Sequence, residues 1–139
     1  MAQRKRELER RDRVERRAGR RCEYCRAPQP VTGVRYHLEH VFPESLGGTD
    51  DLDNLALACP MCNSHKSNHI LGIDDQGSDD GQLFHPRIDR WEEHFDFVFE
   101  TFEVRGKTKK GQGTVNRLRM NDALQIEARK HWVDLGHYP

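Results

Sequence analysis

The distribution of apolar and polar residues predicts a helix at the start of the chain and mixed structure after it. Residues 1 to 21 contain Glu and Arg four positions apart and few helix-breaking residues before Gly19, as in an exposed helix that ends at a glycine. Residues 34 to 41 are rich in β-branched and aromatic residues, which favours a strand. A further helix is expected to begin near Pro60. The first helix is expected to contact the body through Leu8, Val14 and Ala18.

The second half of the chain is patterned by aromatic residues. Phe95, Phe97 and Phe99 alternate as in a strand, and the period restarts out of phase at Phe102, which predicts a turn or bulge between them. Residues 106 to 113, GKTKKGQG, are interpreted as a flexible basic loop that can contact nucleic acid. A last helix, capped by Asp122, is expected to pack through one apolar stripe made of Leu124, Ala128, Trp132 and Leu135.

Length and composition bound the architecture. The chain has 139 residues, 35% hydrophobic and 33% charged, so it can bury only a modest core. We predict one domain, residues 1 to 139, made of a basic helical arm (1 to 21), a central unit (22 to 70) and a supporting extension (71 to 139). No apolar run has the length of a membrane span, so no membrane partner is expected.

The charges are unevenly distributed along a chain whose formal net charge is zero. Residues 1 to 21 contain ten Lys and Arg against four acidic residues, a net of +6 that leaves −6 for the remainder. A basic arm suits binding to phosphates, and the arginines expected to do so are Arg16, Arg17, Arg20 and Arg21. The alternative is a solvated helix stabilised by its own ion pairs. The two interpretations are compatible, because a helix that packs on one face can present its arginines on another.

All four cysteines lie in two Cys-x-x-Cys pairs, separated by residues 26 to 58: Cys22, Cys25, Cys59 and Cys62. Four thiolates at this spacing suit one tetrahedral zinc ion. The alternatives are two disulfides or a redox motif. The start MAQRKRELERR has no secretory pattern, so a reducing cytoplasm is expected and zinc is favoured. Because four sulfurs fill the coordination sphere, this zinc is expected to be structural rather than catalytic.

A second pattern lies between and within the cysteine pairs. It consists of Glu39-His40, Gly47-Gly48, Asn54-Leu55, Cys59-Pro60-Met61-Cys62-Asn63 and Lys66. This pattern resembles the HNH endonuclease family in its zinc-knuckle form, and similarity to a small stand-alone bacterial subgroup continues over residues 13 to 139. The resemblance implies an α+β fold built on a ββα-metal unit, in which a hairpin and a helix hold one divalent cation.

The resemblance also implies an activity and residue roles. The protein would be a metal-dependent endonuclease that hydrolyses phosphodiester bonds of nucleic acid, with DNA as the expected substrate. Glu39 and Asn63 would bind the cation, His40 would be the general base and Asn54 would fix the loop. Aspartate is commoner than Glu39 at its position, and histidine often stands where Asn63 does. Both residues still offer an oxygen ligand, which favours Mg²⁺ or Mn²⁺. Histidine suits the base because it ordinarily titrates near neutral pH.

Two further residues are expected to contact the nucleic acid. Lys66 lies three positions after Asn63 on the expected helix, and His37 shares a strand face with Glu39, although a strand histidine is often structural. The leading alternative for the chain is a non-catalytic zinc-ribbon module that binds nucleic acid or protein. This alternative does not explain the presence of the pair Glu39-His40. Another reading is a nuclease-derived toxin, which would have a neutralising protein partner.

Overall fold

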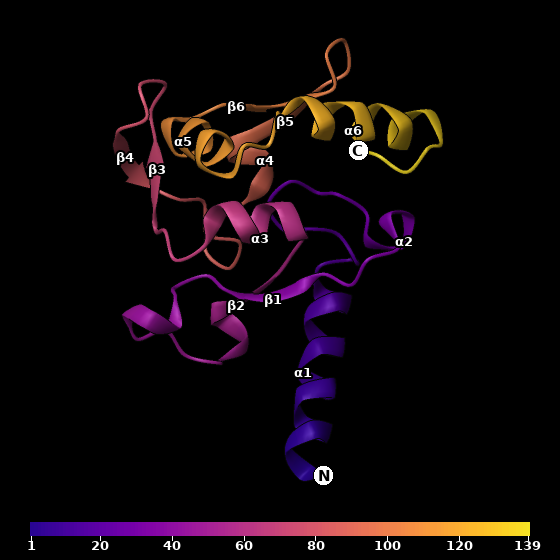
Figure 1. Cartoon of the computed structure of the whole chain (residues 1–139), viewed down its shortest axis with the longest axis vertical. Helices are drawn as coiled ribbons and strands as arrows, with labels where there is room; N and C mark the ends of the chain where they lie inside the picture. Colours follow the sequence, from indigo (N-terminus) through magenta and orange to yellow (C-terminus); the bar gives the residue numbers. More distant parts are fainter.

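A computed structural model describes all 139 residues. The chain begins with a helix that projects from the body (Figure 1). This helix, α1 (Ala2–Arg17), is followed by a left-handed turn at Gly19 and Arg20. The amide of Gly19 donates to the carbonyl of Arg16, and the amide of Arg20 donates to that of Glu15. Gly19 has a φ of +64°, a conformation that glycine adopts at little cost. The helix therefore ends at the glycine that the sequence predicts.

Only the second half of α1 is attached to the body. Val14 is fully buried and Ala18 packs against the core, as predicted, whereas Leu8 is 58% exposed. The guanidinium of Arg11 donates to the backbone carbonyl of Tyr36 (2.8 Å). The first turns of the helix thus stand free of the body, and the prediction for Leu8 is wrong because the body ends before it.

The central unit is a hairpin followed by a helix. Strands β1 (His37–His40) and β2 (Leu55–Ala58) pair antiparallel, with His40 opposite Leu55. Helix α3 (Pro60–Lys66) follows β2 and packs on this hairpin (Figure 1). A one-turn helix, α2 (Gln29–Thr32), precedes β1. This order and pairing are those of a ββα unit, so the predicted α+β class is confirmed.

The extension adds two antiparallel hairpins and three helices. Its elements are β3 (Leu71–Ile73), β4 (Asp79–Gln82), α4 (Trp91–His94), β5 (Phe95–Val98), β6 (Glu103–Gly106), α5 (Lys109–Leu118) and α6 (Ala123–Asp134). Figure 1 shows α5 and α6 at the end of the molecule opposite to the projecting α1. The phase change in the aromatic pattern corresponds to the turn between β5 and β6. None of the helices combines the length and apolar character that crossing a membrane requires.

The segment 106 to 113 is mostly helical, which corrects the prediction of a flexible loop. Helix α5 begins after Thr108, whose hydroxyl accepts a hydrogen bond from the amide of Gly111 (3.0 Å). The glycines allow close packing rather than mobility: a Cβ on Gly111 would lie 2.1 Å from the carbonyl oxygen of His94. The pattern of glycine and lysine is therefore explained by contact between α5 and its neighbours.

The last helix packs through only half of the predicted apolar stripe, since Trp132 packs against the core and Ala128 is half-buried. Leu124 and Leu135 are each 67% exposed. Arg129 is buried instead, and its guanidinium donates to the carbonyl of Met120 (2.7 Å). The predicted cap is correct, since the side chain of Asp122 accepts from the amide at the second position of α6 (3.3 Å). Arginine can occupy this position because its donors meet backbone acceptors.

The core surrounds the cysteines and joins the three parts of the chain. Phe84, from the loop after β4, packs edge to face on Tyr24 and on Phe95, with ring centroids 6.4 and 5.1 Å apart. The hydroxyl of Tyr138 donates to the carbonyl of Cys25 (2.9 Å), across 113 positions of sequence. The extension therefore packs directly on the central unit.

Candidate active site

The four cysteines form one buried cluster. Their sulfur atoms all lie within 4.8 Å of one another, and no disulfide is present. In each pair the amide of the second cysteine points at the first sulfur, at 3.5 Å from Cys25 to Cys22 and 3.4 Å from Cys62 to Cys59. Four buried sulfurs of this kind, with amide donors around them, fit a tetrahedral zinc ion as the sequence predicts.

The first cysteine pair is tied to the hairpin by Glu23. The amide of Glu23 donates to the carbonyl of Leu57 (2.8 Å), and its carboxylate accepts from the amide of Leu57 (2.8 Å). The same carboxylate forms an ion pair with Arg87 of the extension. A zinc ion held by both pairs would thus fix β2 and α3 relative to the start of the chain, which is a supporting role.

The loop between β1 and β2 is held from inside by Asn54. Its side-chain oxygen accepts from the amide of Phe42 (2.8 Å), and its side-chain amide donates to the carbonyls of Phe42 (3.0 Å) and Thr49 (2.8 Å). Gly48 lies where the two sides of the loop backbone come closest, and a Cβ on it would be 1.8 Å from the carbonyl oxygen of Phe42. Two 3₁₀ turns complete the loop: η1 (Glu44–Leu46) and η2 (Leu52–Asn54). This is the arrangement expected of a loop-fixing asparagine.

The loop brings two carboxylates to His40. Nε2 of His40 lies 2.7 Å from Oδ1 of Asp50 and 3.0 Å from Oε1 of Glu44. The side chain of His40 is 24% exposed, and both acids are mainly exposed. The hydrogen bond with His40 lowers the pKa of Asp50, so its carboxylate is ionised at neutral pH.

The bonding of His40 selects a tautomer. A carboxylate can only accept, so the proton of neutral His40 lies on Nε2 and is shared with Asp50 and Glu44. Nδ1 then carries the lone pair, and no group of the protein is hydrogen-bonded to it. A proton taken up at Nδ1 would produce an imidazolium next to two negative charges, which stabilise it. The geometry therefore suits a general base acting through Nδ1.

Glu39 points to the opposite face of β1, toward α3, because successive strand residues alternate sides. Its Oε2 accepts from the hydroxyl of Tyr24 (2.6 Å), and its Oε1 forms an ion pair with the ammonium of Lys66. Glu39 is 5% exposed and Lys66 is 1% exposed. The same ammonium donates to the carbonyl of Val41 (2.9 Å). Burial raises the pKa of Glu39, and the charge of Lys66 opposes this shift.

Glu39 in this arrangement does not fit a divalent cation. One oxygen is held by a tyrosine hydroxyl, whose pKa is raised well above its usual value chiefly by burial, so that the hydroxyl keeps its proton. The other oxygen faces an ammonium, which would repel a second cation. Asn63, the other expected ligand, is half-buried one turn before Lys66 and uses its side chain in no hydrogen bond. A cation at Glu39 would require Lys66 to leave.

The residues expected to contact nucleic acid divide into two groups. Lys66 is enclosed by its partners, so the expected phosphate contact is incompatible with its position. Arg17 donates to the carbonyl of Leu52 (2.7 Å), and Arg21 donates to that of His137 (2.9 Å). Long cationic side chains near backbone carbonyls donate the hydrogen bonds that those carbonyls require. A count of charges in the sequence does not reveal which cations are used in this way. The remaining three are exposed: Arg16, Arg20 and His37.

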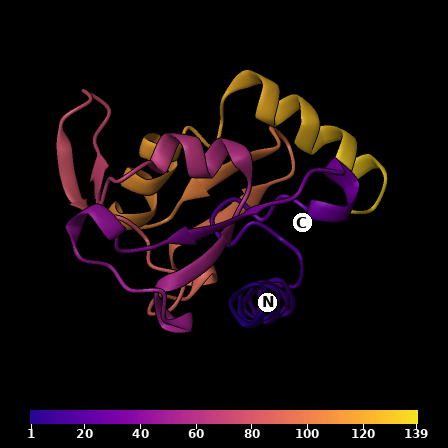
Figure 2. The same ribbon diagram turned by 60° about the horizontal axis from the view of Figure 1, so that its bottom comes forward.

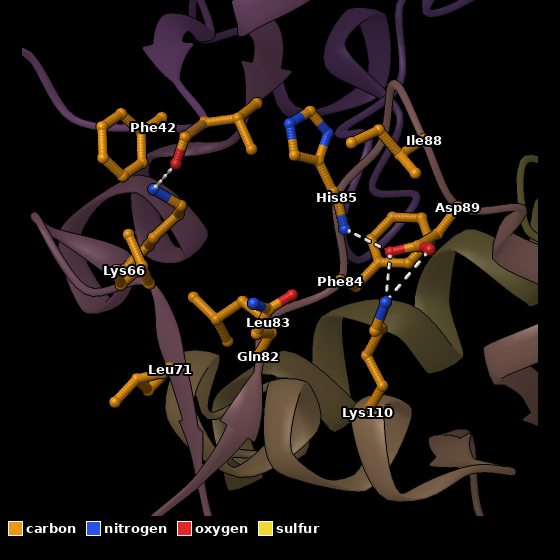
Figure 3. Close-up of a pocket in the computed structure, with 12 residues that line it drawn as sticks. Phe42, Lys66, Leu71, Gln82, Leu83, Phe84, His85, Ile88, Asp89 and Lys110 are labelled. Atoms are coloured by element: carbon orange, nitrogen blue, oxygen red, sulfur yellow. Dashed lines mark hydrogen bonds and ion pairs between the residues drawn. The ribbon is translucent and has the colours of Figure 1, made fainter. Parts of the chain in front are cut away.

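A cavity of about 230 Å³ lies beside Lys66, between the hairpin, β4 and the loop that follows it (Figure 3). Most of its lining is apolar, and its charged wall is the pair Asp89 and Lys110, with Nζ at 3.1 and 3.0 Å from the two carboxylate oxygens. His85 projects at its edge, and Nδ1 of His85 accepts from the amide of Arg87 (3.1 Å). Because its charged groups neutralise one another, the cavity offers no unpaired charge to a ligand.

Sequence reasoning missed three residues of the site. Glu44 lies four positions after His40, and Asp50 follows the Gly47-Gly48 turn. Two acids on either side of a turn this close to His40 could have been predicted to lie near its side chain. Tyr24 lies inside the first cysteine pair, far from Glu39 in sequence, and only the fold brings the two together.

Comparison with known proteins agrees with this geometry. The HNH endonuclease family model matches residues 22–69, which contain both cysteine pairs, the hairpin and α3. No curated protein and no solved structure matches the chain. The matched segment is the part of the chain that holds His40, its two carboxylates and the cysteine cluster. Residues 22–69 of this protein are therefore an HNH endonuclease domain.

Proposed function

We propose that the protein is a metal-dependent endonuclease that hydrolyses phosphodiester bonds of nucleic acid, DNA in particular, with His40 as general base. The observation that carries the proposal is the contact of His40 with Asp50 and Glu44, at 2.7 and 3.0 Å, within an HNH domain. Zinc at the four cysteines has a structural role, because four sulfurs leave no position for substrate. Cysteines that bind zinc rather than forming disulfides suit a cytoplasmic location.

The base acts on the attacking water. Hydrolysis requires a water molecule to lose its proton as it approaches phosphorus. In the proposed mechanism Nδ1 of His40 accepts this proton, while Nε2–H stays bonded to Asp50 and Glu44. The two carboxylates stabilise the imidazolium and keep the ring oriented, so they are positioning residues rather than catalytic ones.

The negative charge that develops on the phosphate needs compensation, and a divalent cation supplies it when bound. Mg²⁺ or Mn²⁺ is the expected ion, and Glu39 with Asn63 is the expected ligand pair. The ion pair of Glu39 with Lys66 argues against this assignment. Glu39→Gln tests it: the Mn²⁺ concentration for half-maximal cleavage should rise if Glu39 is a ligand. An unchanged concentration would assign the ion to other residues.

The closed position of Glu39 favours a second candidate, a non-catalytic zinc module that binds nucleic acid or protein. In such a module the buried pair of Glu39 and Lys66 would replace the ion as a structural contact. This candidate gives no reason for the two carboxylates at His40.

A cleavage panel separates the two candidates. Supercoiled plasmid, single-stranded DNA and RNA are incubated with zinc-loaded protein in the presence and absence of Mg²⁺ or Mn²⁺. The wild-type protein should nick or cut duplex DNA only with the ion. His40→Ala should lose about 10² to 10⁴ in turnover while retaining DNA binding. Wild-type protein that binds DNA but leaves every substrate intact with both ions would support the non-catalytic module instead.

A further inference from the structure

We propose that the groove between α1 and the turn η2 is a binding site for the phosphate backbone of nucleic acid, with Arg6, Arg10 and Arg13 as its phosphate contacts. The groove has a volume of about 420 Å³ and is bounded on the loop side by Leu52. Figures 1 and 2 both show η2 beside α1, on the hairpin side of the helix. This inference rests on the proposed nuclease function and names the surface that would hold its substrate.

The three arginines form a row on one face of the helix. They are spaced four and three positions apart, which places them one above another along α1. Seven residues of helix span about 10 Å, and one strand of duplex DNA carries about three phosphates over that length of its axis. A row of three guanidinium groups is therefore matched to a short run of one backbone.

These arginines are free to bind a ligand. None of Arg6, Arg10 and Arg13 forms an ion pair within the protein. Two acids, Glu9 and Asp12, also line the groove, and Asp12 forms an ion pair with Arg16 (3.0 Å). The groove thus retains a positive excess, and guanidinium groups bind phosphate oxygens in two-pronged contacts.

The two walls of the groove are joined near the end of α1, beyond Arg13, before any ligand binds. Arg17 donates from α1 to the carbonyl of Leu52 (2.7 Å) and to that of Leu55. Val14, on the same stretch of helix, is fully buried against the core. Such preorganisation reduces the ordering that binding would otherwise require. It also explains why Arg17 itself is unavailable to phosphate.

The groove borders the loop that holds the candidate base. Leu52, which lines the groove, lies two residues after Asp50 in the loop between β1 and β2, and Oδ1 of Asp50 lies 2.7 Å from Nε2 of His40. A backbone lying along the arginine row would therefore pass the loop that carries His40. The substrate class indicated is a nucleic-acid strand whose phosphates are contacted without readout of bases.

The experiment compares two double variants of the full-length, zinc-loaded protein. Arg10→Ala/Arg13→Ala removes two groove cations, and Arg4→Ala/Lys5→Ala removes the same charge from exposed positions of α1 outside the groove. Duplex DNA binding is measured over a range of salt concentrations. The groove variant should lower the slope of log K against log salt by about 1.8, since each phosphate contact contributes about 0.9. The control should change the slope by less than half of that.

Cleavage kinetics give an independent reading. The groove variant should raise KM with little change in kcat, because the arginines hold the backbone equally before and during the reaction. A groove variant with the wild-type salt slope, or a control with an equal loss, would overturn the proposal. A wild-type protein that binds DNA without cutting it would refute the nuclease function alone, and the salt slopes would still decide the groove.

Discussion

Replacing Asn54 by alanine tests whether the loop around His40 is held by one side chain. Asn54 is 9% exposed and makes three hydrogen bonds of 2.8, 3.0 and 2.8 Å to the loop backbone. At about 0.5 to 1.5 kcal/mol for each bond, the variant should lose about 1.5 to 4.5 kcal/mol of unfolding free energy. For a chain of this size that is a fall in Tm of roughly 3 to 5 °C per kcal/mol.

The assay is thermal or urea unfolding with zinc in excess, followed by cleavage at a temperature where both proteins are folded. Turnover should also fall, because the same loop brings Asp50 and Glu44 to His40. Asp53→Ala is the matched control, since Asp53 is exposed and adjacent. If Asn54→Ala unfolds at the midpoint of this control and cuts at the wild-type rate, the side chain does not hold the loop.

Two other predictions concern zinc and pH. Purified protein should contain one zinc ion by mass spectrometry, and Cys59→Ser should unfold the domain because zinc binding of about 10 to 16 kcal/mol is coupled to folding; a metal-free folded protein would contradict this. Burial lowers the pKa of His85 below its usual value near 6.5, so the unfolded chain binds a proton first as the pH falls. Stability should therefore drop below about pH 6.5, and less steeply in His85→Asn; equal slopes in urea unfolding would contradict the assignment.

The central unit could be predicted because its signals are local. Paired cysteines, a helix-starting Pro60 and the spacing of Glu39-His40 from Asn54 are properties of short stretches, and the hairpin, α3 and the sulfur cluster follow them. The predicted boundaries were longer than the elements found, since β1 contains only the second half of residues 34 to 41. Strand ends depend on pairing partners, which sequence alone does not supply.

The failures share a different cause. Lys66 and Arg129 look like surface charges in the sequence, yet both are 1% exposed. Lys66 pairs with a buried carboxylate and a backbone carbonyl, and Arg129 donates to a backbone carbonyl. The glycines of residues 106 to 113 signal flexibility in isolation but permit contact between backbones in the fold. Each error concerns a residue whose partner lies outside its own helix. Long-range pairing of this kind leaves no periodic trace.

The hydrogen bond from Tyr138 to the carbonyl of Cys25 gives the cysteine cluster an influence far beyond the HNH domain. It couples the segment after α6 to the first metal-binding turn, so local opening of that segment and release of zinc are not independent events. In hydrogen exchange, amides of α6 should then lose protection when a chelator removes the zinc. Such a loss of protection would make the extension part of one cooperative unit with the cluster.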